Sequence, residues 1–112
     1  MLLSQNEKVH VMHRSYFEKA GGRTLVGTVE ECEAGVARIR GHIYAADQAK
    51  GTPVRQPEAV TRFISLVNGE HLVTPLPETV ALDKVTYAND AKGLRITDGS
   101  DWGIHLSTLT LH

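Results

Sequence analysis

Apolar and polar residues alternate with a period of two along much of this chain, and that period is typical of a half-buried β-strand. The segment 36–45 is the clearest example. Its odd-numbered positions are apolar or glycine: Ala37, Ile39, Gly41, Ile43 and Ala45. Its even-numbered positions are mostly polar: Val36, Arg38, Arg40, His42 and Tyr44. An apolar face opposite a polar face suits an antiparallel sheet with one side in water, so the pattern predicts a fold dominated by strands.

Turn residues divide these alternating segments into hairpins. The β-branched segment 24–29 is joined to segment 36–45 by an acidic turn, so we expect the two to pair. The strongest turn signal is Asn68-Gly69, which lies between two apolar runs. Asn-Gly favours a two-residue type I′ turn, in which both residues have positive φ. This turn predicts a hairpin with Val67 opposite Glu70.

The C-terminal half contains further strand signals. Pro75 is expected to end the strand that follows Asn68-Gly69, because proline cannot donate a hydrogen bond to a ladder. Segments 85–87 and 94–97 predict another hairpin. In total the chain has about six to eight short strands with tight turns. This organisation indicates an all-β fold, or a mainly β fold with one short N-terminal helix, arranged as a small antiparallel barrel or roll.

The N-terminal segment fits two structures. Residues 4–7 have the form of a helical capping box, a helical stripe of apolar residues follows, and Gly21-Gly22 would end such a helix. Residues 8–13, however, also alternate like a strand. Of these alternatives, a helix or helical turn within His10–Ala20 is slightly favoured.

The length of 112 residues suits one domain, 1–112, and 41% hydrophobic residues are enough for a core. One segment is expected to lie outside that core. Residues 47–57 are polar, contain Gly51, Pro53 and Pro57, and are long for a plain connection. We therefore predict a long mobile loop at 47–57.

Composition argues against several classes of protein. Twelve basic and thirteen acidic residues give a net charge of −1, so no strong field points to nucleic acid or to a membrane surface. No apolar run is long enough to span a membrane, and the first residues do not resemble a signal peptide. The single cysteine, Cys32, excludes an internal disulfide. The expected location is the cytoplasm.

No motif identifies an enzyme or a cofactor site. Cys32 lies between Glu31 and Glu33, whose charges favour the unreactive thiol over the thiolate. His10 and His13 are three positions apart, the other four histidines are scattered, and no metal-binding spacing such as His-Glu-x-x-His is present. We therefore assign no catalytic residue, no metal ligand and no cofactor. An enzyme with a pocket near His71 or His105 is kept as a third alternative.

The polar face of segment 36–45 is the candidate ligand site. Arg38, Arg40, His42 and Tyr44 would form a row spaced by about 7 Å, because alternate residues of a strand share a face. Such a row can meet phosphates and stack a base, and Arg62, with Arg55, would extend it if the next strand lay alongside. The simpler interpretation, a solvated strand face, is the favoured one.

The C-terminal tail is the candidate interface. Trp102, Ile104 and Leu106 alternate onto one face, whereas Leu109 and Leu111 fall on the other. A strand edge that is apolar on both sides needs a cover, which either a second copy or the chain's own N-terminal segment could supply.

The favoured function is a small intracellular domain that binds a partner protein or itself. The alternative is a binder of single-stranded nucleic acid or of an anionic ligand through the face of Arg38, Arg40, His42 and Tyr44. Near-zero net charge favours the former, and the arginine row favours the latter.

Overall fold

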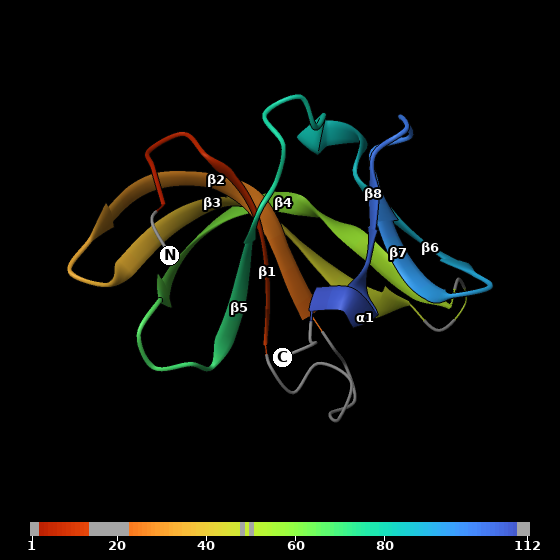
Figure 1. Ribbon diagram of the computed structural model, residues 1–112, viewed down its shortest axis with the longest axis horizontal. Helices are drawn as coiled ribbons and strands as arrows, with labels where there is room; N and C mark the ends of the chain where they lie inside the picture. Colours follow the sequence, from red (N-terminus) through yellow and green to blue (C-terminus); the bar gives the residue numbers. More distant parts are fainter. Residues whose placement is uncertain (1–2, 14–22, 48, 50, 110–112) are drawn as a thin grey trace.

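The computed structural model describes residues 3–13, 23–47, 49 and 51–109, which form two antiparallel sheets (Figure 1). The larger sheet contains β1 (Lys8–His13), β2 (Arg23–Glu33), β3 (Val36–Asp47), β4 (Thr52–Ser65) and β5 (His71–Pro75). The smaller sheet contains β6 (Thr86–Asp90), β7 (Gly93–Thr97) and β8 (Gly103–His105). Two single-turn helices complete the described part, η1 (Leu82–Lys84) and α1 (Leu106–Leu109). Neither is long and apolar enough to cross a membrane.

The mainly β, antiparallel architecture is confirmed, but the larger sheet does not close into a barrel. Its strand order is β4-β3-β2-β1-β5, so β4 and β5 are edges that do not pair with each other. The α-helix, α1, lies near the C-terminal end of the described chain and not near the N-terminus. Residues 10–13 belong to strand β1, so the helix preference was wrong for them, and residues 14–20 lie outside the described part.

Strand β1 resembled a helix in sequence because both of its faces are buried. Val9 and Val11 face one core, whereas His10 and Met12 are buried on the other side of the sheet. A strand buried on both faces has a nearly continuous apolar run, which loses the alternation that distinguishes it from a helix.

The predicted hairpin at Asn68-Gly69 was wrong. Strand β5 pairs with β1, from Val9 opposite Pro75 to His13 opposite His71. Residues 66–70 therefore connect opposite edges of the sheet. Gly69 has a φ of 74°, but Asn68 lacks a positive φ, and its Oδ1 accepts a hydrogen bond from the backbone N–H of Glu70 at 3.0 Å. This side-chain bond makes an Asx turn in place of the type I′ turn.

The other two predicted hairpins are present. Strands β2 and β3 pair in a longer hairpin than expected, and its two-residue turn is Ala34-Gly35, with φ values of 52° and 78°. This turn has the two positive φ values that had been expected at Asn68-Gly69. Strands β6 and β7 form the C-terminal hairpin, in register from Thr86 opposite Thr97 to Asp90 opposite Gly93.

The long loop predicted at 47–57 is also wrong. Strand β3 extends to Asp47 and β4 begins at Thr52, so only residues 48–51 connect them. Pro53 and Pro57 lie within β4, which tolerates them because it is an edge strand and has one side without ladder bonds.

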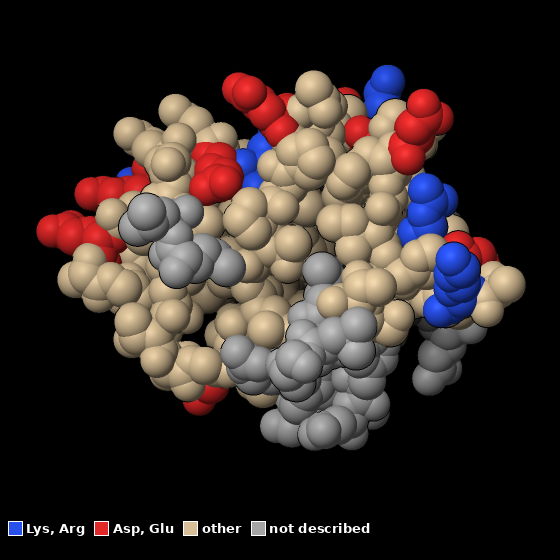
Figure 2. Space-filling view, viewed as in Figure 1, with Lys and Arg blue, Asp and Glu red and all other residues tan. Residues whose placement is uncertain are grey.

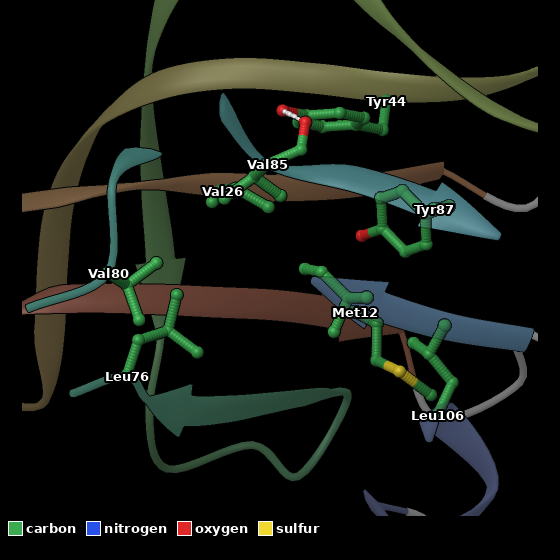
Figure 3. Packing of buried hydrophobic residues seen from close by; sticks show 9 residues of the cluster. Met12, Val26, Tyr44, Leu76, Val80, Val85, Tyr87 and Leu106 are labelled. Carbon is green, nitrogen blue, oxygen red and sulfur yellow. Dashed lines mark hydrogen bonds between the residues drawn. The ribbon is translucent and has the colours of Figure 1, made fainter. Parts of the chain in front are cut away.

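Two hydrophobic cores lie on opposite faces of the larger sheet. The first core joins side chains from all five strands, so the sheet curls around it: Val9, Val11, Leu25, Val29, Ala37, Ile39, Ile64 and Val73. The second core fills the space between the other face and the smaller sheet (Figure 3): Met12, Val26, Tyr44, Leu76, Val80, Val85, Tyr87, Ile96 and Leu106.

Helix α1 explains why the apolar residues of the C-terminal tail stop alternating onto one face. Strand β8 ends at His105, and Leu106, which is fully buried in the second core, begins helix α1. The period of two therefore stops at Leu106. Leu111 and the side chain of Leu109 lie outside the described part, so the interface expected there stays a prediction.

Candidate functional site

The four residues of the predicted row lie on one face of β3 but meet different surroundings. Across the ladder, Arg38 lies opposite Phe63, Arg40 opposite Thr61 and His42 opposite Ala59. The smaller sheet covers one end of this face and leaves the other in solvent. The row is therefore not the uniform exposed surface that the sequence suggested.

Tyr44 lies at the covered end and is only 2% exposed. Its hydroxyl donates a hydrogen bond to the carbonyl oxygen of Val85 at 2.8 Å, shown by the dashed line in Figure 3. Its ring meets that of Tyr87 edge-on, with centroids 5.2 Å apart. Burial raises the pKa of Tyr44, and the charge of Arg55 opposes that rise. Tyr44 therefore packs the second core and presents no ring face on which a base could stack.

Arg38 lies at the open end and is engaged by acidic side chains. A bulge in β2 brings consecutive residues near it, so that Nε lies 3.2 Å from Glu30 and Nη1 lies 3.4 Å from Glu31. Acidic side chains also gather at this end of the molecule in Figure 2, on a face that is otherwise mostly uncharged. Arg38 is thus neutralised locally and is a poor anion ligand.

Arg62 does not extend the row. It lies opposite Ile39, whose side chain belongs to the first core, so Arg62 projects from the other face of the sheet. Arg55 extends the row instead, because an irregularity in the β3–β4 ladder places it opposite Tyr44. The guanidinium of Arg55 is held by η1, donating from Nη1 to the carbonyl oxygen of Asp83 at 2.9 Å.

Arg40, His42 and Arg55 surround a hollow of about 270 Å³, which we call the outer hollow. Its lining residues come from β2, β3, β4 and the η1 turn: Val26, Gly27, Arg40, Gly41, His42, Tyr44, Arg55, Ala59, Leu82 and Asp83. Two arginines and one histidine therefore meet a mostly apolar lining, in which Asp83 is the one acidic residue among the described residues.

The local field in the outer hollow is positive. Partial burial lowers the pKa of His42, and the charges of Arg55 and Arg40 lower it further. Neither arginine is ion-paired with an acidic side chain of the described residues. A bound anion would relieve the repulsion among these groups, so the arrangement suits an anionic ligand.

The remaining polar clusters have structural roles. His105 pairs with Asp90 at 2.7 Å, and Asp90 also accepts the backbone N–H of Lys92. Asp98 accepts hydrogen bonds from Ser100 and from the backbone of Ala81, which lower its pKa to about 2 and fix the turn before Trp102. Cys32 is an exposed free thiol. Within the described ranges, no group of three or more His, Cys, Asp or Glu could hold a metal ion.

Most of the residues that shape the outer hollow from outside β3 could not be identified from the sequence. Leu82 and Asp83 lie about forty positions further along the chain, and Arg55 was only a conditional extension of the row. No known family model, curated protein or solved structure matches this chain.

Proposed function

We propose that this protein is a binding module for a small phosphate-bearing ligand, held in the outer hollow. The observation that supports this proposal is the convergence of Arg40, His42 and Arg55 on one hollow, where no acidic side chain of the described residues is paired to either arginine. Guanidinium groups bind phosphate oxygens through paired N–H donors, and a protonated imidazole adds a further donor. The apolar lining from Val26 and Leu82 would hold the body of the ligand.

Binding of this kind is coupled to protonation. The pKa of free His42 is lowered, so its imidazole is neutral in a larger part of the population than that of an unperturbed histidine at the same pH. A phosphate placed between His42 and the two arginines favours the imidazolium, and binding therefore takes up a proton. Affinity should rise as the pH falls from 7.5 to 6, a trend that phosphate's own protonation opposes below about pH 6.

The test is a calorimetric titration with phenyl phosphate, comparing wild type with an Arg40→Gln/Arg55→Gln variant. Loss of two charge-assisted contacts should weaken binding by at least about tenfold. The matched control is Arg38→Gln, which removes the same charge from a position outside the hollow and should change affinity less than about twofold. Equal binding by wild type and the double variant would contradict the proposal.

A nucleic acid is a weaker candidate for this face. Stacking platforms for single strands need exposed aromatic rings, and the ring of Tyr44 is buried. The acidic residues around Arg38 would repel a phosphate backbone at the open end. We place the module in the cytoplasm, as expected from its single free cysteine.

A second candidate function is binding of a protein partner, including a second copy of this chain. Val36, Phe63 and Val67 are 40%, 70% and 79% exposed, and they gather around the β2–β3 turn. We call this surface the apolar corner. If it binds a second copy, Phe63→Ser should lower the molar mass measured by light scattering at high concentration. A wild-type protein that is monomeric under those conditions would exclude self-association.

A further inference from the structure

We propose that the opposite face of the larger sheet holds a second ligand site, which takes an amphipathic anion: a carboxylate with a short apolar chain. The site is a hollow of about 190 Å³, here called the inner hollow. Its lining comes from β1, β2, β3, β4 and the start of β5: Val11, Met12, His13, Arg23, Thr24, Leu25, Ile43, Arg62, Ile64 and His71.

The floor of the inner hollow is part of the first core. Val11, Leu25 and Ile64 belong to that core, and Ile43 packs against it. These side chains come from four different strands, so they form a continuous apolar surface at the bottom of the hollow. An alkyl chain of a few carbons would bury apolar area there, at about 0.8 kcal/mol for each methylene group.

The remaining charged or titratable lining residues are all basic. His13 and His71 lie directly opposite each other on β1 and β5, with ring centroids 5.4 Å apart. Arg23, at the start of β2, and Arg62, on β4, are exposed, and neither is ion-paired with an acidic side chain of the described chain. Among the described residues, no aspartate or glutamate lines the hollow. Two guanidinium groups beside an apolar floor suit a carboxylate attached to an alkyl chain.

His71 provides an additional polar group. Its imidazole lines the hollow, and its buried Nδ1 has no hydrogen-bond partner among the described residues. Burial and the charge of His13 lower the pKa of His71, whereas Glu70, the nearby acidic group, raises it. A bound carboxylate would add to the effect of Glu70 and favour the imidazolium.

The inner hollow is separate from the outer hollow. Arg62 and Arg40 project from opposite faces of the sheet, because Arg62 is paired with Ile39, the neighbour of Arg40 along β3. The two sites therefore share no basic side chain, and each can be removed while the other stays intact. The second site does not depend on the function proposed for the first.

The experiment is an NMR titration with hexanoate, acetate and hexan-1-ol, followed at the backbone amides of Leu25 and Ile43. Hexanoate should bind at least about tenfold more tightly than either other probe, because only hexanoate offers both a charge and an alkyl chain. Hexan-1-ol binding as tightly as hexanoate would show that the basic rim contributes nothing. Acetate binding as tightly as hexanoate would show that the apolar floor contributes nothing. Either result overturns the proposal.

Variants assign the site. Arg23→Gln/Arg62→Gln should weaken hexanoate binding by about tenfold or more and leave phenyl phosphate binding within about twofold of wild type. The matched control, Arg38→Gln, should bind hexanoate as wild type does. The variant Arg40→Gln/Arg55→Gln should lose phenyl phosphate but retain hexanoate, so failure of one site is distinguishable from failure of the other. Loss of hexanoate binding in that last variant would place the carboxylate in the outer hollow and contradict the second site.

Discussion

Ala34 is poorly suited to its position in the turn between β2 and β3, because this position requires a positive φ. It has a φ of 52° in the two-residue turn between β2 and β3, a conformation that costs alanine about 1 kcal/mol and that asparagine tolerates. Ala34→Asn creates the Asn-Gly pair that such turns prefer. We expect it to stabilise the protein by about 0.5–1 kcal/mol, measured from urea unfolding midpoints.

A matched control is available in the other two-residue turn. Ala91 is exposed in the β6–β7 turn and lacks a positive φ. Ala91→Asn should therefore change stability by less than about 0.5 kcal/mol. Equal effects at the two positions would show that backbone conformation at Ala34 is not the cause.

His10 gives the protein a specific sensitivity to acid. It is buried beneath the smaller sheet, where its Nε2 shares a hydrogen bond with the hydroxyl of Tyr87 at 2.8 Å. Burial lowers the pKa of His10 from 6.5 to about 4. Above pH 6.5 the imidazole is neutral in both states and stability is fully present. As the pH falls from 6.5 to about 4, His10 binds a proton in the unfolded chain but not in the folded one. This difference lowers the free energy of unfolding by on the order of 3 kcal/mol.

Two measurements test this acid sensitivity. The ring protons of His10, followed by NMR in the folded protein, should not titrate until the pH approaches 4. The unfolding free energy of His10→Gln should fall less steeply than that of wild type between pH 6.5 and 4. A titration of the folded His10 ring near pH 6.5 would rule out the buried neutral imidazole.

At the scale of elements, the pairing of β2 with β3 depends on two facing glycines. Gly27 lies directly opposite Gly41, and their backbones approach so closely that a Cβ on Gly41 would lie 2.1 Å from the carbonyl oxygen of Val26. Backbone cannot move aside as a flexible side chain can. Gly41→Ala should therefore destabilise the protein by about 2–4 kcal/mol, measured by chemical unfolding.

Gly103 in β8 provides the control for this substitution. The three atoms nearest to a Cβ there belong to the end of the Arg95 side chain, which can rotate away. Gly103→Ala should cost less than about 1 kcal/mol. A similar loss at both glycines would mean that the close approach of the two backbones does not determine the effect.

Local sequence signals predicted the individual strands better than they predicted which strands pair with each other. The β2–β3 and β6–β7 hairpins were predictable because each strand pairs with its neighbour in sequence. The β1–β5 ladder was not predictable, since Val9 and Pro75 are joined by no local turn signal. Because local sequence does not reveal such long-range pairing, Asn68-Gly69 resembles a hairpin turn in sequence. Its Asx turn satisfies the backbone locally while the chain crosses from one edge of the sheet to the other.

At the scale of the whole molecule, both hollows depend on long-range placement. The sequence identified Arg40 and His42 correctly as neighbours on one strand face. It could not show that the smaller sheet buries Tyr44, or that Arg62 belongs to the opposite face, because both facts depend on the register of β4 and the packing of β6. The inner hollow brings together residues from five strands, and no motif marks such a set.

The two cores should unfold together, because β1, β2 and β3 contribute side chains to both. Trp102 is the one tryptophan and packs against the second core, whereas Ile39 is fully buried in the first. Ile39→Val should lower stability by about 1 kcal/mol and shift the midpoints from Trp102 fluorescence and from far-ultraviolet circular dichroism equally. Separate midpoints for the two signals would show that the cores unfold independently.

The position of β1 between β2 and β5 has a consequence for biosynthesis. A ribosome adds residues at about 5–20 per second, so β1 emerges roughly 3–12 s before its partner β5. During that interval one edge of β1 and the apolar side chains Val9, Val11 and Met12 lack their final cover. The nascent chain therefore exposes an apolar segment with an unpaired strand edge for seconds, long enough for a chaperone to bind it. Among the described strands, β1 is the most thoroughly buried, and the interval between its synthesis and that of its last ladder partner, β5, is the longest.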